Sequence, residues 1–151
     1  MAHIETATGE HVEGIIELSQ QGWRDIIHAT GVNPNVLRKN LNDFIFMAEY
    51  YVRVAVDDGK VVGAFCGRVA PTWWSEDWVA EGIGVYILPE YRGKGLAVPM
   101  YKGFMEWAEG YKRVKNIRLQ TSAGGLDMTK FFNRLGTHQI GGVYIKEVNR
   151  S

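Results

Sequence analysis

The sequence has only one cysteine, Cys66, and this scarcity removes several classes of protein at once. A single thiol excludes an internal disulfide and argues against a cysteine-rich zinc site. We expect Cys66 to be a small core residue of a strand. Three of the histidines, His3, His11 and His138, show no ligand-like spacing. We therefore expect no bound metal.

An excess of charge of one sign is also lacking. Seventeen Lys and Arg balance 17 Asp and Glu, so nothing attracts the chain in general to nucleic acid or to an anionic membrane surface. No apolar run approaches the ~18 residues of a membrane span, and residues 1–11 lack the pattern of a secretory signal. We expect a soluble cytoplasmic protein with no nucleic-acid or membrane partner, in which any anion binding is local.

What the sequence does have is a large apolar fraction, 46% of 151 residues, arranged in periodic segments. This length and composition predict one domain over residues 1–151. The periodicity predicts an α/β (α+β) fold in the order β-α-α-β-β-β-α-β-α-β, a mixed sheet with helices on both faces. The predicted strands are 4–8, the two arms of a hairpin over 51–69, 78–88, 116–122 and 137–148, the last as one strand or as a very short hairpin at Gly141-Gly142. One predicted helix begins near residue 10, with Thr8 as its N-cap, and three others cover 34–45, 96–111 and 128–135.

Local signals mark several of these elements. Asn33 followed by Pro34 predicts a capped start for the second helix. Asp58-Gly59 suits a tight primed turn in the hairpin. Gly82 and Gly84 predict a bulge or a close neighbour in the strand 78–88.

The most informative stretch is ILPEYRGKGLAVPMY, residues 87–101, where a strand meets a basic, glycine-rich turn and a helix follows at once. The first N–H groups of a helix lack intrahelical partners and carry partial positive charge, so an anion, most naturally a phosphate, is stabilised there. Gly93 and Gly95 let a ligand approach the backbone closely, and Arg92 and Lys94 add positive charge. The turn therefore predicts a phosphate-binding site.

Two other phosphate-binding motifs do not fit this turn. A P-loop needs G-x-x-x-x-G-K-[ST], which the sequence does not contain. A dinucleotide fingerprint needs a third glycine where Val98 stands, and it needs an acid near the end of the next strand, where NIRLQTS has none.

The stretch VYILPEYRGKGLAVPMYKGFMEWA instead resembles motif A of the GNAT family of N-acetyltransferases. The family signature, Q/R-x-x-G-x-G/A, is matched by Arg92, Gly95 and Ala97. The resemblance implies a GNAT-like, mostly antiparallel twisted sheet. It also implies an enzyme that moves an acetyl group from acetyl-CoA to a primary amine, on a small molecule or a protein, by direct attack.

The resemblance assigns roles to residues on both sides of the turn. The pyrophosphate of acetyl-CoA would lie on the backbone N–H groups of residues 92 to 97, and the strand 116–122 would part from the motif A strand to admit the thioester. Glu81 would be the catalytic proton acceptor, with Glu76 and Asp77 as alternatives. The expected cofactor-binding residues are Val85, Tyr86, Ile87, Arg92, Gly93, Lys94, Gly95, Leu96, Ala97 and Ser122.

The sequence also departs from the family pattern. The general-acid tyrosine, four residues before Gly136, is replaced by Phe132, and Tyr86, Tyr144, Ser122 or water are left as substitutes. The segment after Gly136 is too short for two full strands, so the sheet edge is either exposed or completed by a partner subunit, as in a homodimer. The alternative function is a catalytically impaired GNAT-fold protein that binds CoA or other proteins and acts in regulation.

Four residues are candidates for the acceptor site, whose amine the sequence does not identify. Trp23 and His28 lie near the expected loop between the first two helices, and Trp73 and Trp74 are adjacent in the loop APTWWSED. Two neighbouring tryptophans in a loop cannot easily both be core. They either form a binding wall or dimer face, or pack over the core.

Overall fold

The computed structural model describes residues 1–23, 31–120, 128–142, 144, 146 and 148. Its strands and helices follow one another along the chain as predicted up to residue 135. The strands are β1 (His3–Thr6), β2 (Tyr50–Asp57), β3 (Lys60–Pro71), β4 (Trp78–Ile87) and β5 (Val114–Arg118), and the helices are α1 (Val12–Trp23), α2 (Pro34–Phe46), α3 (Ala97–Glu109) and α4 (Thr129–Arg134), with 3₁₀ turns η1 (Gly9–His11) and η2 (Pro89–Tyr91).

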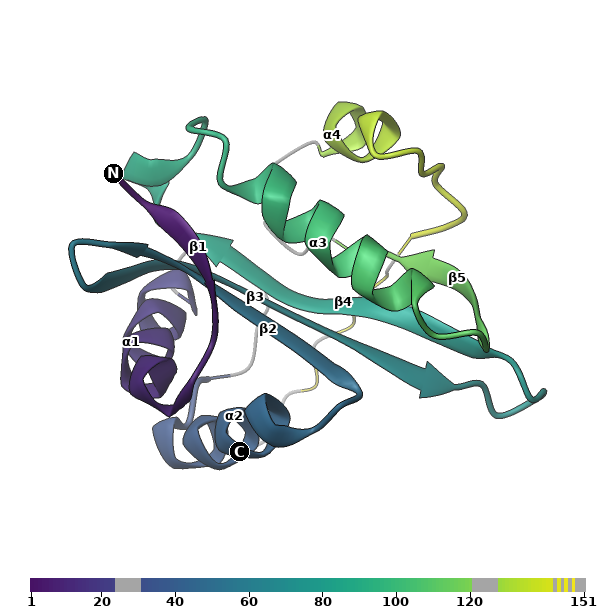
Figure 1. Ribbon diagram of the computed structural model, residues 1–151, viewed down its shortest axis with the longest axis horizontal. Helices are drawn as coiled ribbons and strands as arrows, with labels where there is room; N and C mark the ends of the chain where they lie inside the picture. Colours follow the sequence, from purple (N-terminus) through teal and green to yellow (C-terminus); the bar gives the residue numbers. More distant parts are fainter. Residues whose placement is uncertain (24–30, 121–127, 143, 145, 147, 149–151) are drawn as a thin grey trace.

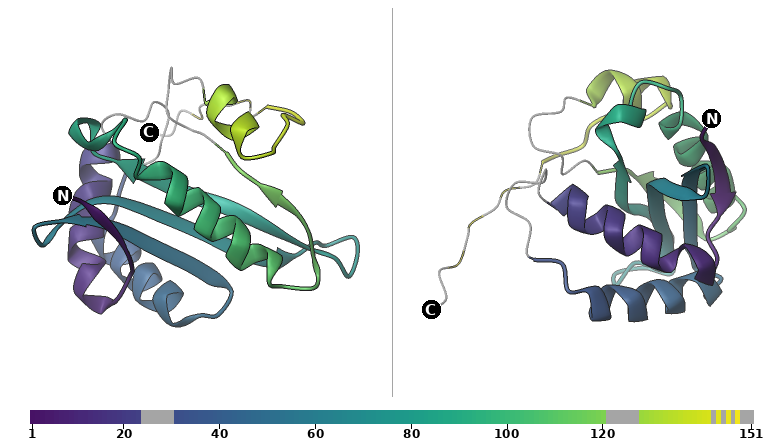
Figure 2. Two further views of the ribbon diagram at one scale, coloured as in Figure 1. Left: turned by 45° about the horizontal axis from the view of Figure 1, so that its top comes forward. Right: turned by 90° about the vertical axis from the view of Figure 1, so that its left-hand side faces the viewer.

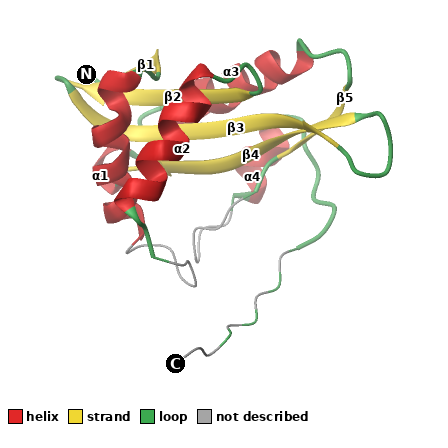
Figure 3. Cartoon of the chain, turned by 90° about the horizontal axis from the view of Figure 1, so that it is seen from below, coloured by secondary structure: helices red, strands yellow, loops and turns green. Residues whose placement is uncertain are grey.

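The five strands form one sheet in chain order, β1-β2-β3-β4-β5 (Figure 1). The first four are antiparallel to their neighbours, and β5 runs parallel to β4 after the crossover through α3. Helices α1 and α2 cover one face of the sheet and α3 the other (Figures 2 and 3). The predicted mixed, mostly antiparallel sheet with helices on both faces is confirmed.

Local sequence signals explain where the second helix and the hairpin form. The Asn33 side chain accepts hydrogen bonds from the N–H groups of Asn35 at 3.0 Å and Val36 at 3.3 Å, and Pro34 follows at the first helical position. Asp58 and Gly59 join β2 to β3 with φ of 48° and 79°. Positive φ at both positions is what a tight primed turn requires, so both predictions are confirmed.

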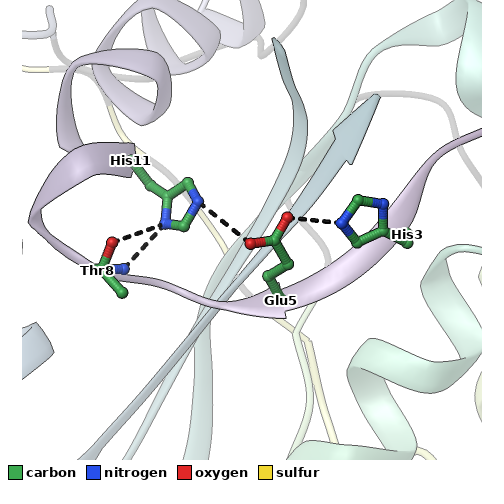
Figure 4. A network of polar contacts seen from close by, with 4 residues as sticks. All are labelled: His3, Glu5, Thr8 and His11. Carbon is green, nitrogen blue, oxygen red and sulfur yellow. Dashed lines mark hydrogen bonds and ion pairs between the residues drawn. The ribbon is translucent and has the colours of Figure 1, made fainter. Parts of the chain in front are cut away.

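A network of polar contacts lies just before the first helix (Figure 4). Thr8 is the N-cap of η1, which leads into α1, and its backbone N–H donates to Nδ1 of His11 at 2.9 Å. The Glu5 carboxylate lies between two imidazoles, 2.6 Å from His3 Nε2 and 3.7 Å from His11 Nε2. These contacts order the start of the chain over β1 and η1.

The main core lies between α3 and the sheet. Phe104 of α3 and Phe65 of β3 are almost completely buried, with ring centroids 5.2 Å apart, and Tyr51 of β2 packs on both. Gly67 makes room for this packing, because a Cβ on it would lie 2.3 Å from the Phe104 ring. The helix is thereby drawn close to the sheet, which fixes where its first turn points.

Two predicted strands need correction. β5 (Val114–Arg118) begins two residues before the predicted strand 116–122 and does not include residues 119–120, while 121–122 lie outside the described residues. Of the predicted strand 137–148, residues 137–142 form no strand. Ile140 and Tyr144 are instead 81% and 95% exposed. Alternating apolar residues become a strand only beside a neighbour that takes up their backbone hydrogen bonds, and the pair Gly141-Gly142 weakens the segment further. A second copy covering the β5 edge stays a prediction.

Among the described residues, no helix has both the length and the apolar character needed to cross a bilayer.

Candidate active site

The first feature of the site is a bulge in the middle of β4. Cys66 of β3 is in register with Gly84, but the next residue, Gly67, is in register with Gly82, so Ile83 is an extra residue on β4. The sequence predicted a bulge or a close neighbour at these two glycines, and the bulge is confirmed. Its effect is to turn Tyr86 toward the same face as Glu81, although strict alternation would place them on opposite faces.

The second feature is the point where β4 and β5 separate. Their pairing runs from Trp78 and Val114 to Glu81 and Arg118, and it includes no later residue of the described chain. The β4 segment 82–87 continues to pair with β3 alone. The side of β4 that faces β5 is therefore without a described strand partner beyond Glu81, as the resemblance to motif A led us to expect.

The third feature is a run of free amides at the start of α3. In the described part of the chain, the backbone N–H groups of residues 93–97 have no hydrogen-bond partner, and Leu96 makes no side-chain cap. Gly93 and Gly95 have φ of 75° and 81°, and a Cβ on either would meet no atom within 4 Å. Several N–H groups are thus exposed around open space at the positive end of a 13-residue helix.

Arg92 differs from the residues that follow it. Its backbone N–H donates to the Pro89 carbonyl at 3.2 Å, so the free amides begin at Gly93. Its Nε donates to the Ile87 carbonyl at 2.8 Å, and the guanidinium lies 5.2 Å from the Tyr86 ring centroid. Arg92 can therefore contribute to an anion site through the outer nitrogens of its guanidinium.

The turn before α3 is anchored to the end of β2. The Tyr91 hydroxyl donates to Asp57 Oδ2 at 2.7 Å. This hydrogen bond lowers the pKa of the Asp57 carboxyl and raises the pKa of Tyr91. Lys94 Nζ lies 5.6 Å from the Tyr91 ring centroid, so a cation is present beside the free amides.

Glu81 lies in a row of polar side chains that crosses four strands. Tyr50, Arg68, Glu81 and Arg118 are in register from β2 to β5 and so share a face. Tyr50 stacks on Phe44 of α2, with centroids 3.9 Å apart, which identifies the face as the one that α1 and α2 cover. We call these four residues the Glu81 row.

Contacts within the Glu81 row hold the carboxylate in place. Arg68 Nη2 donates to Glu81 Oε2 at 3.2 Å, with the two side chains 42% and 24% exposed. The pKa of Arg68 is raised, first through the Tyr50 hydroxyl and then through Glu81. Arg68 Nε is buried without a partner. The site thus presents a half-buried carboxylate oriented by a guanidinium and still open to solvent.

The position of the missing general acid is filled by a packed ring. Phe132 is half-buried, 5.6 Å from the ring centroid of Tyr101, whose pKa burial raises to about 12. Of the substitutes left open, Tyr86 packs against α1, where a Cβ on Gly22 would lie 2.9 Å from its ring. Tyr144 is 95% exposed, and Ser122 lies outside the described residues.

Of the four acceptor candidates, the two whose side chains the structure describes, Trp73 and Trp74, are not in contact with Glu81. Trp73 and Trp74 are 91% and 60% exposed, so they do not pack over the core, and their rings meet edge to face at 5.6 Å. They lie in the β3–β4 loop, at the opposite end of β4 from the free amides (Figure 1). His28 and the side chain of Trp23 lie outside the described residues. The acceptor role of all four stays a prediction.

Sequence reasoning missed Arg68, Tyr50 and Arg118. Arg68 follows the apolar run VVGAFCG, and a charge at the end of such a run is a weak signal. Its importance appears only from the register of three strand pairs.

A cavity lined by described residues lies away from these features. A cavity of about 360 Å³ lies between the start of α1 and the β2–β3 turn, and Glu10, His11, Glu17 and Lys60 are among its lining residues. It includes neither Glu81 nor residues 93–97. In the described ranges, no three His, Cys, Asp or Glu side chains gather in a way that could hold a metal ion.

Comparison with known proteins places this geometry in context. The family model for the "Acetyltransferase (GNAT) family" matches residues 13–137. A comparison with curated protein sequences finds no match. One similar solved structure is an acetyltransferase from Trypanosoma brucei, at 18% identity and a TM-score of 0.74 over 98% of this chain and 100% of that one.

Two further structures are similar over nearly their whole length. Glucosamine-6-phosphate N-acetyltransferase from Arabidopsis thaliana has 14% identity and a TM-score of 0.75, with 99% of each chain covered. An aminoglycoside N-acetyltransferase in complex with CoA has 16% identity and a TM-score of 0.73, with 98% of this chain and 100% of that chain covered. At these identities the likeness shows the fold.

Proposed function

The chain belongs to the acetyltransferase (GNAT) family, and we propose that it transfers an acetyl group from acetyl-CoA to a primary amine by direct attack. One observation carries the proposal. The pairing of β4 with β5 stops at Glu81, while the same strand β4 leads into the free amides of residues 93–97. A carboxylate, an unpaired strand edge and an anion site thus follow one another along one strand.

The amides of residues 93–97 hold the diphosphate of acetyl-CoA in this proposal. Their N–H groups need acceptors, and diphosphate oxygens supply them where the helix dipole favours negative charge. Gly93 and Gly95 leave the space around these amides open, and the guanidinium of Arg92 and the ammonium of Lys94 add charge. Bound there, acetyl-CoA supplies its acetyl group as a thioester.

The unpaired edge of β4 guides the pantetheine arm. Beyond Glu81 the backbone of Val85, Tyr86 and Ile87 has no described neighbour on the β5 side, so the amide groups of an extended arm take the place of an added strand. The arm then leads from the anion site back toward Glu81. Ser122, which lies outside the described residues, is expected to bind the cofactor as well.

Glu81 accepts the proton that the acceptor must lose. A primary ammonium, with a pKa near ~10.4, has no lone pair, so one proton must leave before attack, and the Glu81 carboxylate accepts it through water. The amine nitrogen then bonds to the carbonyl carbon, the carbon–sulfur bond breaks with its electron pair on sulfur, and the second proton that the nitrogen loses passes to water. Because a thiol has a pKa of about 8.5, the thiolate leaves without an acid at position 132.

The test is thiol release from acetyl-CoA with a panel of amines. Glu81→Gln is expected to lower kcat by about 10²–10⁴-fold, the usual contribution of a general base, and to leave the Kd of acetyl-CoA unchanged. Glu76→Gln tests the alternative base, and Glu109→Gln, which removes an exposed carboxylate from the end of α3, is the matched control. Equal turnover by the wild type and Glu81→Gln would refute the assignment of the base.

Phe132 favours a second candidate function. The ring packs where the family has its acid, and the Tyr101 ring that it meets edge to face belongs to a buried residue whose pKa burial raises to about 12. A protein that binds CoA without turning over any amine would fit the regulatory alternative. Calorimetry with acetyl-CoA beside the same amine panel separates the two.

A further inference from the structure

The Glu81 row carries more positive than negative charge. Arg68 and Arg118 lie in register on either side of Glu81, so two guanidiniums flank one carboxylate. Arg68 contacts Glu81 at 3.2 Å. Arg118 Nε donates to Asn116 Oδ1 at 3.3 Å, and no acidic side chain of the described residues pairs with it. One cation is therefore left over beside the proposed proton acceptor.

The unpaired positive charge of Arg118 limits which acceptor amines can bind beside Glu81. An ammonium at Glu81 adds a positive charge opposite Arg118, and like charges at directly opposite positions of neighbouring strands repel. An acceptor that carries an anionic group close to its amine removes the repulsion. Its ammonium lies at Glu81, and its anion lies at the fork of guanidinium donors on the neighbouring strand.

A second observation on the Glu81 row concerns Arg68 Nε. It is a buried donor without a partner in a side chain that is otherwise 42% exposed. Because protein atoms cover Nε, an anion bound within the Glu81 row would offset the charge of Arg68 rather than accept a hydrogen bond from Nε.

We propose that the acceptor is a monoamine that carries a carboxylate or phosphate within a few bonds of its amine, and that Arg118 binds this anionic group. The inference rests on the proposed function, since Glu81 must be where the amine reacts. It argues against polyamines, whose second ammonium would meet Arg118. An α-amino acid and a phosphorylated amino sugar both have the required chemistry.

The experiment compares acceptors that differ only in the anion. An α-amino acid is paired with its carboxamide, and an amino sugar phosphate with the unphosphorylated sugar, with a polyamine as a further arm. The anionic member of at least one pair is expected to have a KM at least tenfold lower, and the pair that shows the difference identifies the anion as carboxylate or phosphate.

Variants then assign the effect to Arg118. Arg118→Gln is expected to abolish the tenfold difference by raising the KM of the anionic acceptor alone, and Arg118→Lys should restore part of it. Lys115→Gln removes an exposed cation from the same strand and should change neither KM. Thermal unfolding of each variant checks that the fold is intact.

The outcomes separate this inference from the function on which it rests. Turnover with equal KM within each pair, or preference for the polyamine, would overturn the inference and leave the acetyltransferase in place. An unchanged preference in Arg118→Gln would overturn the role of that residue. Binding of acetyl-CoA with no turnover of any amine would overturn both the proposed function and the inference.

Discussion

Two helices of this protein begin in opposite ways. At α2, Asn33 caps the N–H groups of Asn35 and Val36, and Pro34 has no N–H to satisfy. At α3, Leu96 provides no side-chain cap, and the amides of residues 93–97 have no partner in the described chain. The N–H groups at the start of α2 are satisfied by the residue before it, whereas those at the start of α3 have no acceptor within the described chain.

The difference shows what α3 gives up in stability. An N-cap such as Asn33 is worth about 1 kcal/mol, and α3 forgoes it. The space around Gly93 and Gly95 is not filled by the protein, whereas the space around Gly67 is filled by Phe104. The glycines before α3 therefore serve a backbone turn and leave space for the ligand that we propose, and Gly67 serves the core.

The largest expected effect comes from placing a carboxylate among the free amides. Aspartate tolerates positive φ, so Gly95→Asp should fold, but its charge would face the diphosphate. At an effective dielectric constant near 20, two charges about 4 Å apart repel by roughly 4 kcal/mol, so the Kd of acetyl-CoA should rise at least about 100-fold in calorimetry. Gly59→Asp, at φ 79° with open space around it, is the control. If Gly95→Asp and Gly59→Asp bound acetyl-CoA with equal affinity, the start of α3 would not be the diphosphate site.

The next effect distinguishes a glycine in a packed position from a glycine with open space around it. Gly67→Ala would place a Cβ 2.3 Å from Phe104 and should lower the free energy of unfolding by about 1–3 kcal/mol, as overpacking does. Gly84→Ala has no atom within 4 Å of the added carbon and should lose little. Urea unfolding of both variants measures the difference, and equal losses would show that crowding is not the cause.

The capped helix start provides a smaller effect. Asn33→Ala should lower the free energy of unfolding by about 1 kcal/mol without changing the Kd of acetyl-CoA. Asn42→Ala, at an exposed position within the same helix, should be close to neutral. If Asn33→Ala weakened acetyl-CoA binding as much as it destabilised the fold, the two helix starts would not be independent.

The smallest effect concerns pH. The Tyr91 hydrogen bond lowers the pKa of Asp57, so its contribution to stability is present above the unfolded pKa and is lost as the pH falls below about 4, toward the folded pKa. Tyr91→Phe should therefore lose less stability than the wild type between pH 7 and pH 3. Urea unfolding at both pH values measures this, and an equal loss would show that the bond does not anchor the turn.

The parts of this fold that could be predicted from the sequence are those that local chemistry sets. Asn33-Pro34 starts a helix and Asp58-Gly59 turns a hairpin, because each acts on its nearest neighbours in the chain. The glycines and cations at 92–95 predict an anion site at the start of α3, and this stays a prediction.

The rest depends on contacts between distant segments. The bulge at Ile83 reverses which residues of β4 face α1, so period-2 alternation could not place Glu81 and Tyr86 on one face. The Glu81 row exists only because three strand registers coincide. The segment 137–142 has the alternation of a strand, yet it has no sheet neighbour in the described chain.

Backbone amide resonances give the most direct test of whether the free amides of residues 93–97 bind the diphosphate of CoA. Titration of ¹⁵N-labelled protein with CoA should shift the amide signals of Gly93, Lys94, Gly95, Leu96 and Ala97 strongly, because each N–H gains a phosphate acceptor. The amides of Asn35 and Val36, already bound by Asn33, should stay in place. If the α3 amides did not shift at saturating CoA, or if the α2 amides shifted equally, the anion site described here would be wrong.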